Sequence, residues 1–138
     1  MKEVIHVGLF SYGMSGRVFH APFLHTNPKF SIKKILQRSA SDARLRYPYV
    51  EIARTPEELY GDPEIDLIVV NTPDHTHFEL ARDALKAGKH VVVEKPFVLS
   101  MEEGEELIEL ADRKGKKLTV FQNRRWEGDF LTVQKIIE

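Results

Sequence analysis

Short apolar segments recur along the chain and alternate with longer segments of mixed polarity. The apolar segments lie at residues 4–10, 30–36, 50–53, 65–71, 91–93 and 118–122. Their length and their content of Val, Ile and Phe are typical of β-strands. Residues 65–71 are apolar on both faces, which is typical of a strand in a parallel sheet covered by helices on each side. We therefore expect this segment to lie centrally in a sheet.

The segments between the strands carry helix signals. A helix should begin at Met14, and Pro22 should interrupt or end it. Two segments, 55–58 and 100–103, match the capping box, in which a Glu reaches back to the start of its helix. Gly88 stands where a left-handed helix cap belongs. The alternation predicts an α/β fold with a doubly wound, mainly parallel sheet and helices on both faces.

Charge and composition narrow the range of partners. The 138 residues include 20 Lys and Arg against 21 Asp and Glu. This balance gives no electrostatic reason to expect nucleic acid or an anionic membrane surface as a partner. No apolar segment approaches the ~20 residues of a membrane-spanning helix, and Met1–Phe10 lacks the layout of a secretory signal. Without cysteine there is no disulfide or thiolate zinc site, and we expect a soluble, cytoplasmic protein.

The turn after the first strand carries part of a dinucleotide-binding fingerprint. Ser11, Gly13 and Gly16 occupy the three glycine positions of the pattern G-x-G-x-x-G, between a strand and a helix. Gly13 would let the backbone approach a pyrophosphate, and N–H groups at the helix start, at Met14 and Ser15, would receive it. Ser11 replaces the first glycine, so its φ should be negative. The alternative is a structural turn that binds no ligand.

The end of the second strand bears on the choice between NAD and NADP. An acidic residue there would hydrogen-bond the ribose 2′-OH, but no carboxylate lies between the end of this strand and Asp42. Arg38 offers a guanidinium and Ser39 a hydroxyl, which suit a 2′-phosphate. The segment therefore predicts NADP, with NAD as the alternative cofactor. A solvated surface role for Arg38 is the other interpretation.

Polar residues follow the fourth and fifth strands, at the edge where open α/β sheets bind ligands. Asn71, Thr72 and Pro73 should contact the nicotinamide half of the cofactor. Lys95 follows the fifth strand, and its ammonium would stabilise a developing alkoxide during hydride transfer. From the residues alone, a solvated loop lysine is the alternative. Glu94 either orients Lys95, beside the cofactor, or lies exposed.

Two histidines and two residues after the sixth strand complete the candidates. His75 and His77 lack a matched carboxylate or thiolate, so we expect no metal site. His77 should line the cofactor cleft or cap the next helix. Asn123 and Arg125 follow the sixth strand on the same edge, and either reach cofactor or substrate or belong to the charged surface.

The last segment, residues 129–137, has the pattern of an amphipathic helix. Phe130, Val133, Ile136 and Ile137 share its apolar side. This stripe should pack either against a further domain or against the same domain.

Four motifs together resemble one family. NTPDHTH at 71–77 and AGKHVVVEKP at 87–96 are similar to the glucose-fructose oxidoreductase, inositol dehydrogenase and rhizopine catabolism family, Gfo/Idh/MocA. FHAPFL at 19–24 and QNRRW at 122–126 extend the resemblance over nearly the whole chain. All of it falls in the N-terminal Rossmann domain of that family.

The resemblance implies a domain plan and a function. Residues 1–122 would form the dinucleotide-binding domain, and residues 123–138 would lead toward a C-terminal substrate domain that this chain lacks. Lys95 would be the catalytic lysine beside the nicotinamide, and Pro96 would follow a cis peptide bond. The QNRRW ending is similar to a subgroup with inositol dehydrogenases, which implies a sugar or cyclitol substrate. A homo-oligomer is implied for the full-length parent.

Two functions are therefore expected from the sequence. The first is the cofactor domain of an NADP(H)-dependent oxidoreductase that moves hydride to or from a sugar or cyclitol, the isolated chain being catalytically incomplete. The second is a dinucleotide-sensing or regulatory module without chemistry.

Overall fold

A six-stranded parallel sheet forms the centre of the molecule. The computed structural model describes residues 4–138, so the first three residues of the expected domain 1–122 lie outside it. The strands are β1 (Ile5–Leu9), β2 (Phe30–Leu36), β3 (Glu51–Ala53), β4 (Leu67–Val70), β5 (His90–Val93) and β6 (Leu118–Val120). Their order is β3-β2-β1-β4-β5-β6, and every neighbouring pair is parallel. The predicted fold class and the central place of β4 are confirmed.

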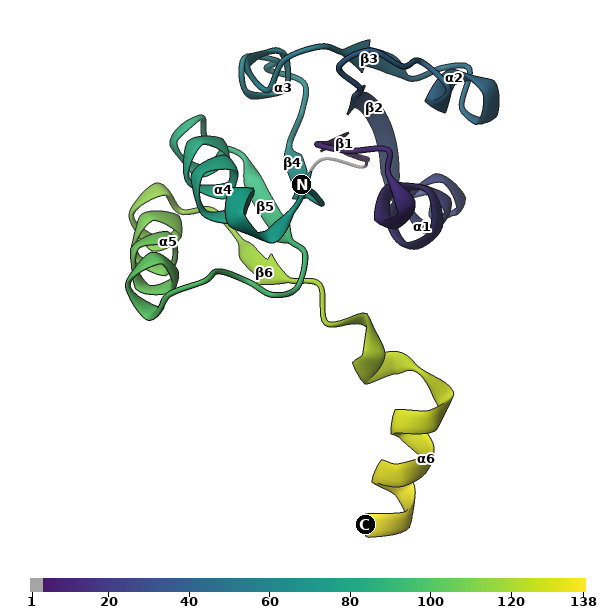
Figure 1. The fold of residues 1–138 in the computed structure, drawn as a ribbon, viewed down its shortest axis with the longest axis vertical. Coiled ribbons are helices and arrows are strands. Elements are labelled where there is room, and N and C mark those ends of the chain that lie inside the picture. Colours follow the sequence, from purple (N-terminus) through teal and green to yellow (C-terminus); the bar gives the residue numbers. More distant parts are fainter. Residues whose placement is uncertain (1–3) are drawn as a thin grey trace.

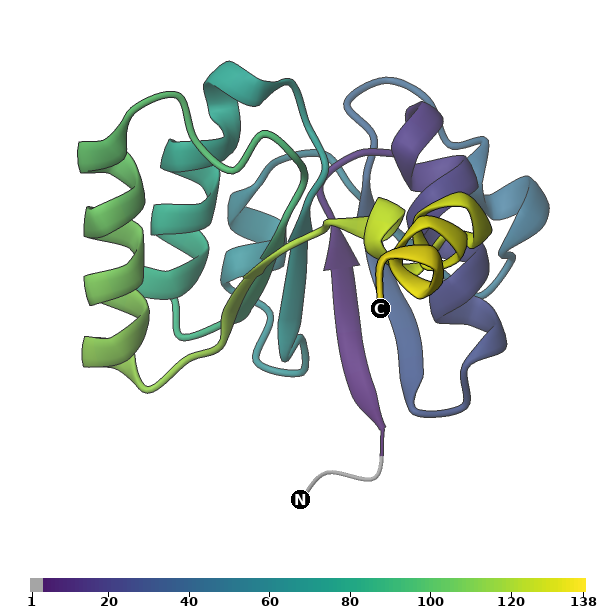
Figure 2. The ribbon, with the colours of Figure 1, turned by 90° about the horizontal axis from the view of Figure 1, so that it is seen from below.

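Helices cover both faces of the sheet (Figures 1 and 2). The α-helices are α1 (Ala21–Thr26), α2 (Ala43–Arg46), α3 (Glu57–Tyr60), α4 (His77–Lys86), α5 (Met101–Lys114) and α6 (Gly128–Ile137). The shorter helical turns are η1 (Gly16–His20), η2 (Asp74–Thr76) and η3 (Asn123–Trp126). The sequence patterns did not predict α2 or η2.

Two apolar cores lie on opposite faces of the sheet. Ile68 and Val70 belong to the core that includes residues of α3, α4 and α5. Val69, between them in β4, belongs to the core that includes residues of α1 and α2. Because successive side chains of a strand point to opposite faces, one short apolar strand supplies both cores. This is the physical basis of the doubly wound arrangement.

The helix after the glycine turn continues past Pro22. Helical residues run from Met14 to Thr26, and η1 is a π-helical turn within this stretch. The N–H of Ala21 donates to the carbonyl oxygen of Gly16, five residues earlier. Proline lacks an N–H and disturbs a regular α-helix, whereas a π turn lets the chain stay helical. The expected interruption is thus a change of hydrogen-bond pattern, not an end of the helix.

The two capping boxes differ in outcome. Ser100 Oγ accepts from the Glu103 N–H at 3.2 Å and starts α5 as predicted. Glu58 Oε1 accepts from the Thr55 N–H at 3.1 Å, but the Thr55 hydroxyl makes no cap hydrogen bond. Gly88 has the expected positive φ, 77°.

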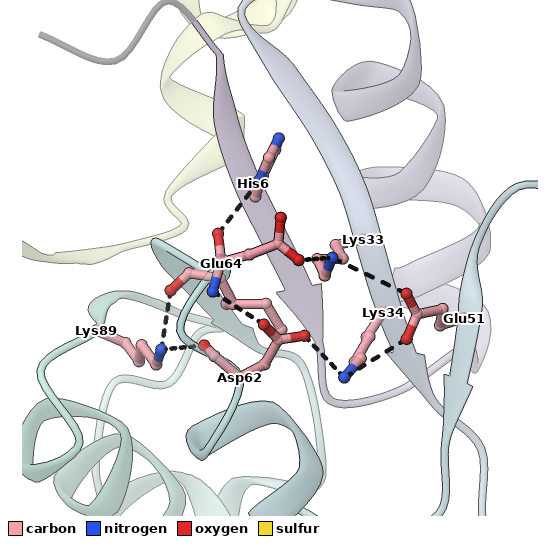
Figure 3. A network of polar contacts seen from close by, with 8 residues as sticks. His6, Lys33, Lys34, Glu51, Asp62, Glu64 and Lys89 are labelled. Carbon is pink, nitrogen blue, oxygen red and sulfur yellow. Dashed lines mark hydrogen bonds and ion pairs between the residues drawn. The ribbon is translucent and has the colours of Figure 1, made fainter.

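A network of ion pairs closes the amino edge of the sheet (Figure 3). Lys34 Nζ lies 2.7 Å from Asp62 Oδ2 and 3.5 Å from Glu51 Oε2, while Lys33 pairs with Glu51 and Glu64. The register of β2 against β1 shifts by one residue here, since Val7 pairs with Ile32 and Gly8 with Lys34. Such a bulge re-aims side chains, and two consecutive lysines reach the same carboxylate.

The last helix projects from the body of the domain (Figure 1). An apolar groove of about 1280 Å³ lies between α1, β6 and α6, with Phe19, Phe121 and Phe130 among its lining. Ile136 and Ile137 on α6 are exposed. Among residues 4–138, no helix is long and apolar enough to cross a membrane.

Candidate functional site

A cleft of about 710 Å³ opens where β1, β2 and β4 end. The loops that begin at the carboxyl ends of these strands line it, together with Arg54 and Pro56 after β3. Six predicted cofactor residues meet there: Ser11, Gly13, Arg38, Ser39, Thr72 and Pro73. The topology explains this meeting, because parallel neighbours place their carboxyl ends at one edge of the sheet.

Asn71 holds the turn after β1 in place. Its Oδ1 accepts from the Ser11 N–H at 3.0 Å, and its Nδ2 donates to the Ser11 carbonyl oxygen at 2.9 Å. Nδ2 also lies 3.4 Å from Ser15 Oγ. Asn71 is buried, and its amide is used on the protein backbone. It therefore shapes the turn, and its contact with the nicotinamide half of the cofactor stays a prediction.

The two glycines of the turn have different reasons for being glycine. A Cβ on Gly16 would collide with the Ser11 carbonyl oxygen and lie 3.0 Å from Asn71 Nδ2. A Cβ on Gly13 would meet only Ser11 Oγ, at 3.3 Å, so Gly13 leaves the cleft open to a ligand. These are the two tasks predicted for them, close packing and close approach.

Ser11 fits the first position of the fingerprint. No residue other than glycine has a positive φ within residues 4–138, so the predicted negative φ of Ser11 is confirmed. Its Oγ accepts from the Gly13 N–H at 3.0 Å. The hydroxyl proton of Ser11 is then left to donate toward the cleft. The side chain supports the turn from within.

The start of the helix offers N–H donors. The Arg17 N–H makes the first i→i−4 bond, to the Gly13 carbonyl oxygen at 3.0 Å. The N–H groups of Met14, Ser15 and Gly16 precede that bond and have no i−4 partner in the helix. Helix starts of this kind receive phosphate groups. The turn therefore fits a pyrophosphate.

The β2–α2 loop presents a guanidinium and a hydroxyl. Arg38 and Ser39 are exposed, and within residues 4–138 neither side chain makes a hydrogen bond or ion pair. The carboxylate of Asp42 is occupied, since its two oxygens pair with Gln37 Nε2 and Arg17 Nη2. Hydrogen bonding from Gln37, with the charge of Arg17, lowers the pKa of Asp42. This carboxylate stays ionised and engaged, so it is not directed to a ribose hydroxyl.

A buried pair lies beneath Lys95. His20 Nε2 and Glu94 Oε1 are 2.8 Å apart, and both residues are buried. Glu94 Oε2 accepts from the Lys95 N–H at 3.2 Å. Glu94 therefore orients Lys95 through its backbone, while the Lys95 ammonium is exposed and unpaired within the described chain. Lys95–Pro96 is a cis peptide bond, which confirms what the family resemblance implied.

His77 ties two loops of the site together. Its Nδ1 lies 2.7 Å from the Pro96 carbonyl oxygen, and its Nε2 lies 2.9 Å from the Thr72 carbonyl oxygen. The residue is 1% exposed. The structure thus places His77 under the cleft and not in its lining. Among residues 4–138, no cluster of His, Asp and Glu could hold a metal ion.

Asn123 and Arg125 lie elsewhere. Both line the apolar groove between α1, β6 and α6. Neither lines the cleft at the ends of β1, β2 and β4. The structure therefore does not bring them together with the other candidates.

Sequence reasoning missed two residues of the site, His20 and Arg54. His20 stands in the FHAPFL motif, and a histidine in an apolar helix segment was an available signal. Arg54 follows β3 and bonds to the β2–α2 loop. Its role is a contact between segments far apart in sequence, for which no local pattern exists.

Residues 5–122 match the family described as "Oxidoreductase family, NAD-binding Rossmann fold". This match covers most of the chain and confirms the resemblance to Gfo/Idh/MocA proteins. A curated relative is the scyllo-inositol 2-dehydrogenase (NADP(+)) IolW of Bacillus subtilis, 43% identical over 98% of this chain and 38% of its own length.

Solved structures agree with this match. A protein from Bacteroides fragilis, provisionally classed as an oxidoreductase, is 59% identical with a TM-score of 0.94, over 99% of this chain and 42% of its own. GenD2 from gentamicin A biosynthesis, solved in complex with NAD, is 28% identical with a TM-score of 0.90, over 99% and 39%. The chain thus spans about two fifths of the length of these relatives.

Proposed function

The chain belongs to the oxidoreductase family with an NAD-binding Rossmann fold, and on this premise we propose that it binds NADP(H) for hydride transfer. In this proposal the hydride moves to or from a carbon that bears a hydroxyl or ketone in a sugar or cyclitol. Residues 1–122 serve as the dinucleotide-binding unit, and residues 123–138 lead toward a substrate-binding part.

One observation carries the choice of NADP. Arg38 and Ser39 face the cleft without partners in the described chain, while Asp42 is engaged by Arg17 and Gln37. A 2′-phosphate supplies the acceptor oxygens that a free guanidinium and hydroxyl lack. The name of IolW, an NADP(+) enzyme acting on scyllo-inositol, supports both the cofactor and the substrate class.

In this proposal the pyrophosphate binds at the turn that Asn71 holds. Gly13 leaves the approach open, and the N–H groups of Met14, Ser15 and Gly16 donate to the phosphate oxygens. The Ser11 hydroxyl, which already accepts from Gly13, donates its proton in the same direction. Thr72 and Pro73 line the same cleft one strand away, toward the nicotinamide half.

Lys95, which follows β5, is the residue that we propose to assist hydride transfer. When bound, the nicotinamide accepts or supplies the hydride. In the reducing direction the Lys95 ammonium would donate a hydrogen bond to the ketone oxygen, stabilise the negative charge that develops there as the carbon accepts hydride, and pass its proton to that oxygen. In the oxidising direction the neutral Lys95 amine would accept the hydroxyl proton as the hydride leaves the carbon. Glu94 fixes the Lys95 backbone, and His77 holds the carbonyl of Pro96 beside it. These contacts pre-orient the ammonium.

Titration of the chain with NADPH and NADH, followed by nicotinamide fluorescence, tests the proposal. We expect NADPH to bind at least about tenfold tighter, and Arg38→Ala to weaken NADPH about tenfold while changing NADH by less than about twofold. Equal affinities for both cofactors, unaffected by the substitution, would contradict the 2′-phosphate site. Lys95→Met should retain NADPH binding and abolish cyclitol oxidation by the enzyme that contains this chain.

A further inference from the structure

A single arginine clasps the β2–α2 loop, residues 37–42. Nη1 of Arg54 donates to the carbonyl oxygens of Gln37 and Ala40, each at 2.5 Å. Its Nη2 donates to Ser41 Oγ at 2.7 Å. These partners precede Arg54 by 17, 14 and 13 residues. One guanidinium therefore fixes the beginning and the end of the loop.

Arg54 is itself anchored. Its backbone N–H donates to Glu58 Oε1 at 2.9 Å, and the Thr55 N–H donates to the same oxygen at 3.1 Å. Glu58 is thus used on backbone amides at the start of α3. Within residues 4–138, the Arg54 guanidinium makes no ion pair with a carboxylate. Its positive charge remains available at the cleft.

The opposite side of the loop is held by Gln37. Its Oε1 accepts from the Ala43 N–H at 3.1 Å, and its Nε2 donates to Asp42. The loop backbone is therefore fixed from both sides. Arg38 and Ser39 lie between the clasped points, and they line the cleft together with Arg54. The backbone of the loop is therefore held in place, while the side chains of Arg38 and Ser39 have no partner in the described chain.

The donor inventory of Arg54 leaves room for a ligand. A guanidinium carries five N–H donors, and three are used on the loop. An anion bound beside Arg38 would meet a second guanidinium that is already held in place. A phosphate monoester on the ribose has the charge and the oxygens for this arrangement, whereas a ribose hydroxyl has neither.

We infer that Arg54 is a positioning residue that determines preference for a cofactor with a 2′-phosphate. It holds the loop in the shape in which Arg38 and Ser39 meet the phosphate, and its charge adds to the attraction. This inference rests on the proposed NADP(H) function. It concerns the affinity difference between NADPH and NADH, because only NADPH places a phosphate at this loop.

The test compares three substitutions in the 138-residue chain. Arg54→Lys keeps the charge and loses the planar fork, and Ser41→Ala removes one bond of the clasp. Arg44→Lys is the matched control, because Arg44 Nε also donates to a carbonyl, that of Val50 at 3.1 Å, but does not line the cleft. We expect Arg54→Lys to weaken NADPH about tenfold and Ser41→Ala about threefold, with NADH changed by less than about twofold. Arg44→Lys should alter neither affinity.

Competition with adenosine 2′,5′-bisphosphate and with adenosine 5′-phosphate gives a second readout. Arg54→Lys should weaken binding of the bisphosphate only, whereas damage to the whole adenosine site would weaken binding of both ligands. Thermal unfolding by circular dichroism checks that each variant is folded. If Arg54→Lys does not fold, Ser41→Ala still tests the clasp. The inference would be overturned if the ratio of NADPH to NADH affinity stayed the same, whether both affinities were unchanged or both fell by the same factor. If Arg38→Ala also leaves NADPH affinity unchanged, the proposed NADP(H) function is wrong. If Arg38→Ala weakens NADPH strongly while the Arg54 and Ser41 variants do not, only the inference about Arg54 is wrong.

Discussion

The two edges of the sheet treat positive charge in opposite ways. At the amino edge, Lys33 and Lys34 each contact two carboxylates, and the buried Lys89 ammonium donates to the carbonyl oxygens of Asp62 and Ile65 (Figure 3). At the carboxyl edge, Arg38 and Lys95 have side chains without a partner in the described chain. Lysine side chains therefore complete the fold at one edge, whereas at the other edge Lys95 and Arg38 are left unpaired within the described chain.

This difference indicates which edge of the sheet is suited to bind an anion. A cation that already has its counter-charges gains little from a further anion. A cation whose backbone is fixed and whose head group is free gains the full hydrogen bond. At the carboxyl edge, side chains of the protein hold the backbones of Ser11 and Lys95 and, on either side of Arg38, those of Gln37 and Ala40. Substitutions at the two edges should consequently separate stability from cofactor affinity.

The largest effect is expected at the carboxyl edge, for Gly16→Ala. The added Cβ meets the Ser11 carbonyl oxygen and the Asn71 amide, so the turn must move. We expect NADPH affinity to fall on the order of 100-fold and the free energy of unfolding to fall by about 1–3 kcal/mol. Fluorescence titration and urea unfolding measure the two losses.

Gly128→Ala is the control for that substitution. A Cβ at Gly128, at the start of α6, meets no atom within 4 Å. Its cofactor affinity should equal that of the unmodified chain. Undiminished NADPH binding by Gly16→Ala would show that the turn does not form the phosphate site.

At the amino edge, Asp62→Asn should lower stability without changing cofactor affinity. Burial is the largest single influence on Asp62 and opposes its charged form. The hydrogen bonds from Lys34 and the Glu64 N–H, with the charges of Lys34 and Lys33, together outweigh burial and lower the pKa of the carboxyl. The substitution leaves Lys34, 18% exposed, without its nearest counter-charge. We expect a loss of about 2 kcal/mol in the free energy of unfolding by urea, with NADPH affinity unchanged.

Glu64→Gln is the matched variant, because Glu64 also pairs with a lysine but its side chain is 63% exposed. An exposed pair contributes little, so urea unfolding should be unaltered. If Asp62→Asn weakened NADPH as strongly as it weakened the fold, the separation of the two edges would be wrong.

Local patterns in the sequence were sufficient for the sheet. The strands are short segments rich in Val, Ile, Leu and Phe. β4 supplies both cores from adjacent residues, which is why its central place was predictable. The π turn was not predictable in form, because Pro22 indicates only that a regular helix cannot continue. The four-residue α2 lacks the length over which helical periodicity can be recognised.

The residues of the site also divide into those that local sequence patterns predict and those that they do not. Gly13, Gly16 and Arg38 could be named because fixed spacing places them after particular strands. The clamp by Asn71 crosses 60 residues, and the His20–Glu94 contact crosses 74. Contacts of that kind depend on the final packing of the strands, which no window of the sequence contains.

The smallest expected effect concerns His20, whose buried pair with Glu94 is the carboxyl edge's counterpart to the lysine network. Burial disfavours the imidazolium more than Glu94 favours it, so the pKa of His20 lies below its ordinary value of 6.5. As pH falls through 6.5, the unfolded chain takes up a proton that the folded chain does not, and unfolding becomes easier. Stability should therefore decline below pH 6.5 by at most about 1.4 kcal/mol per pH unit for this group, and level off below the folded pKa.

Urea unfolding between about pH 5 and pH 7 measures this decline, and His20→Gln should reduce its slope while keeping a donor for Glu94. His90 contributes in the same direction, because burial, with the charges of Lys116 and Lys117, lowers its pKa as well. His90→Gln is thus the comparison that divides the slope between the amino edge, where His90 begins β5, and the carboxyl edge. A slope that His20→Gln leaves intact and His90→Gln removes would assign the pH dependence to the amino edge alone, and the buried pair would then act only by holding Lys95.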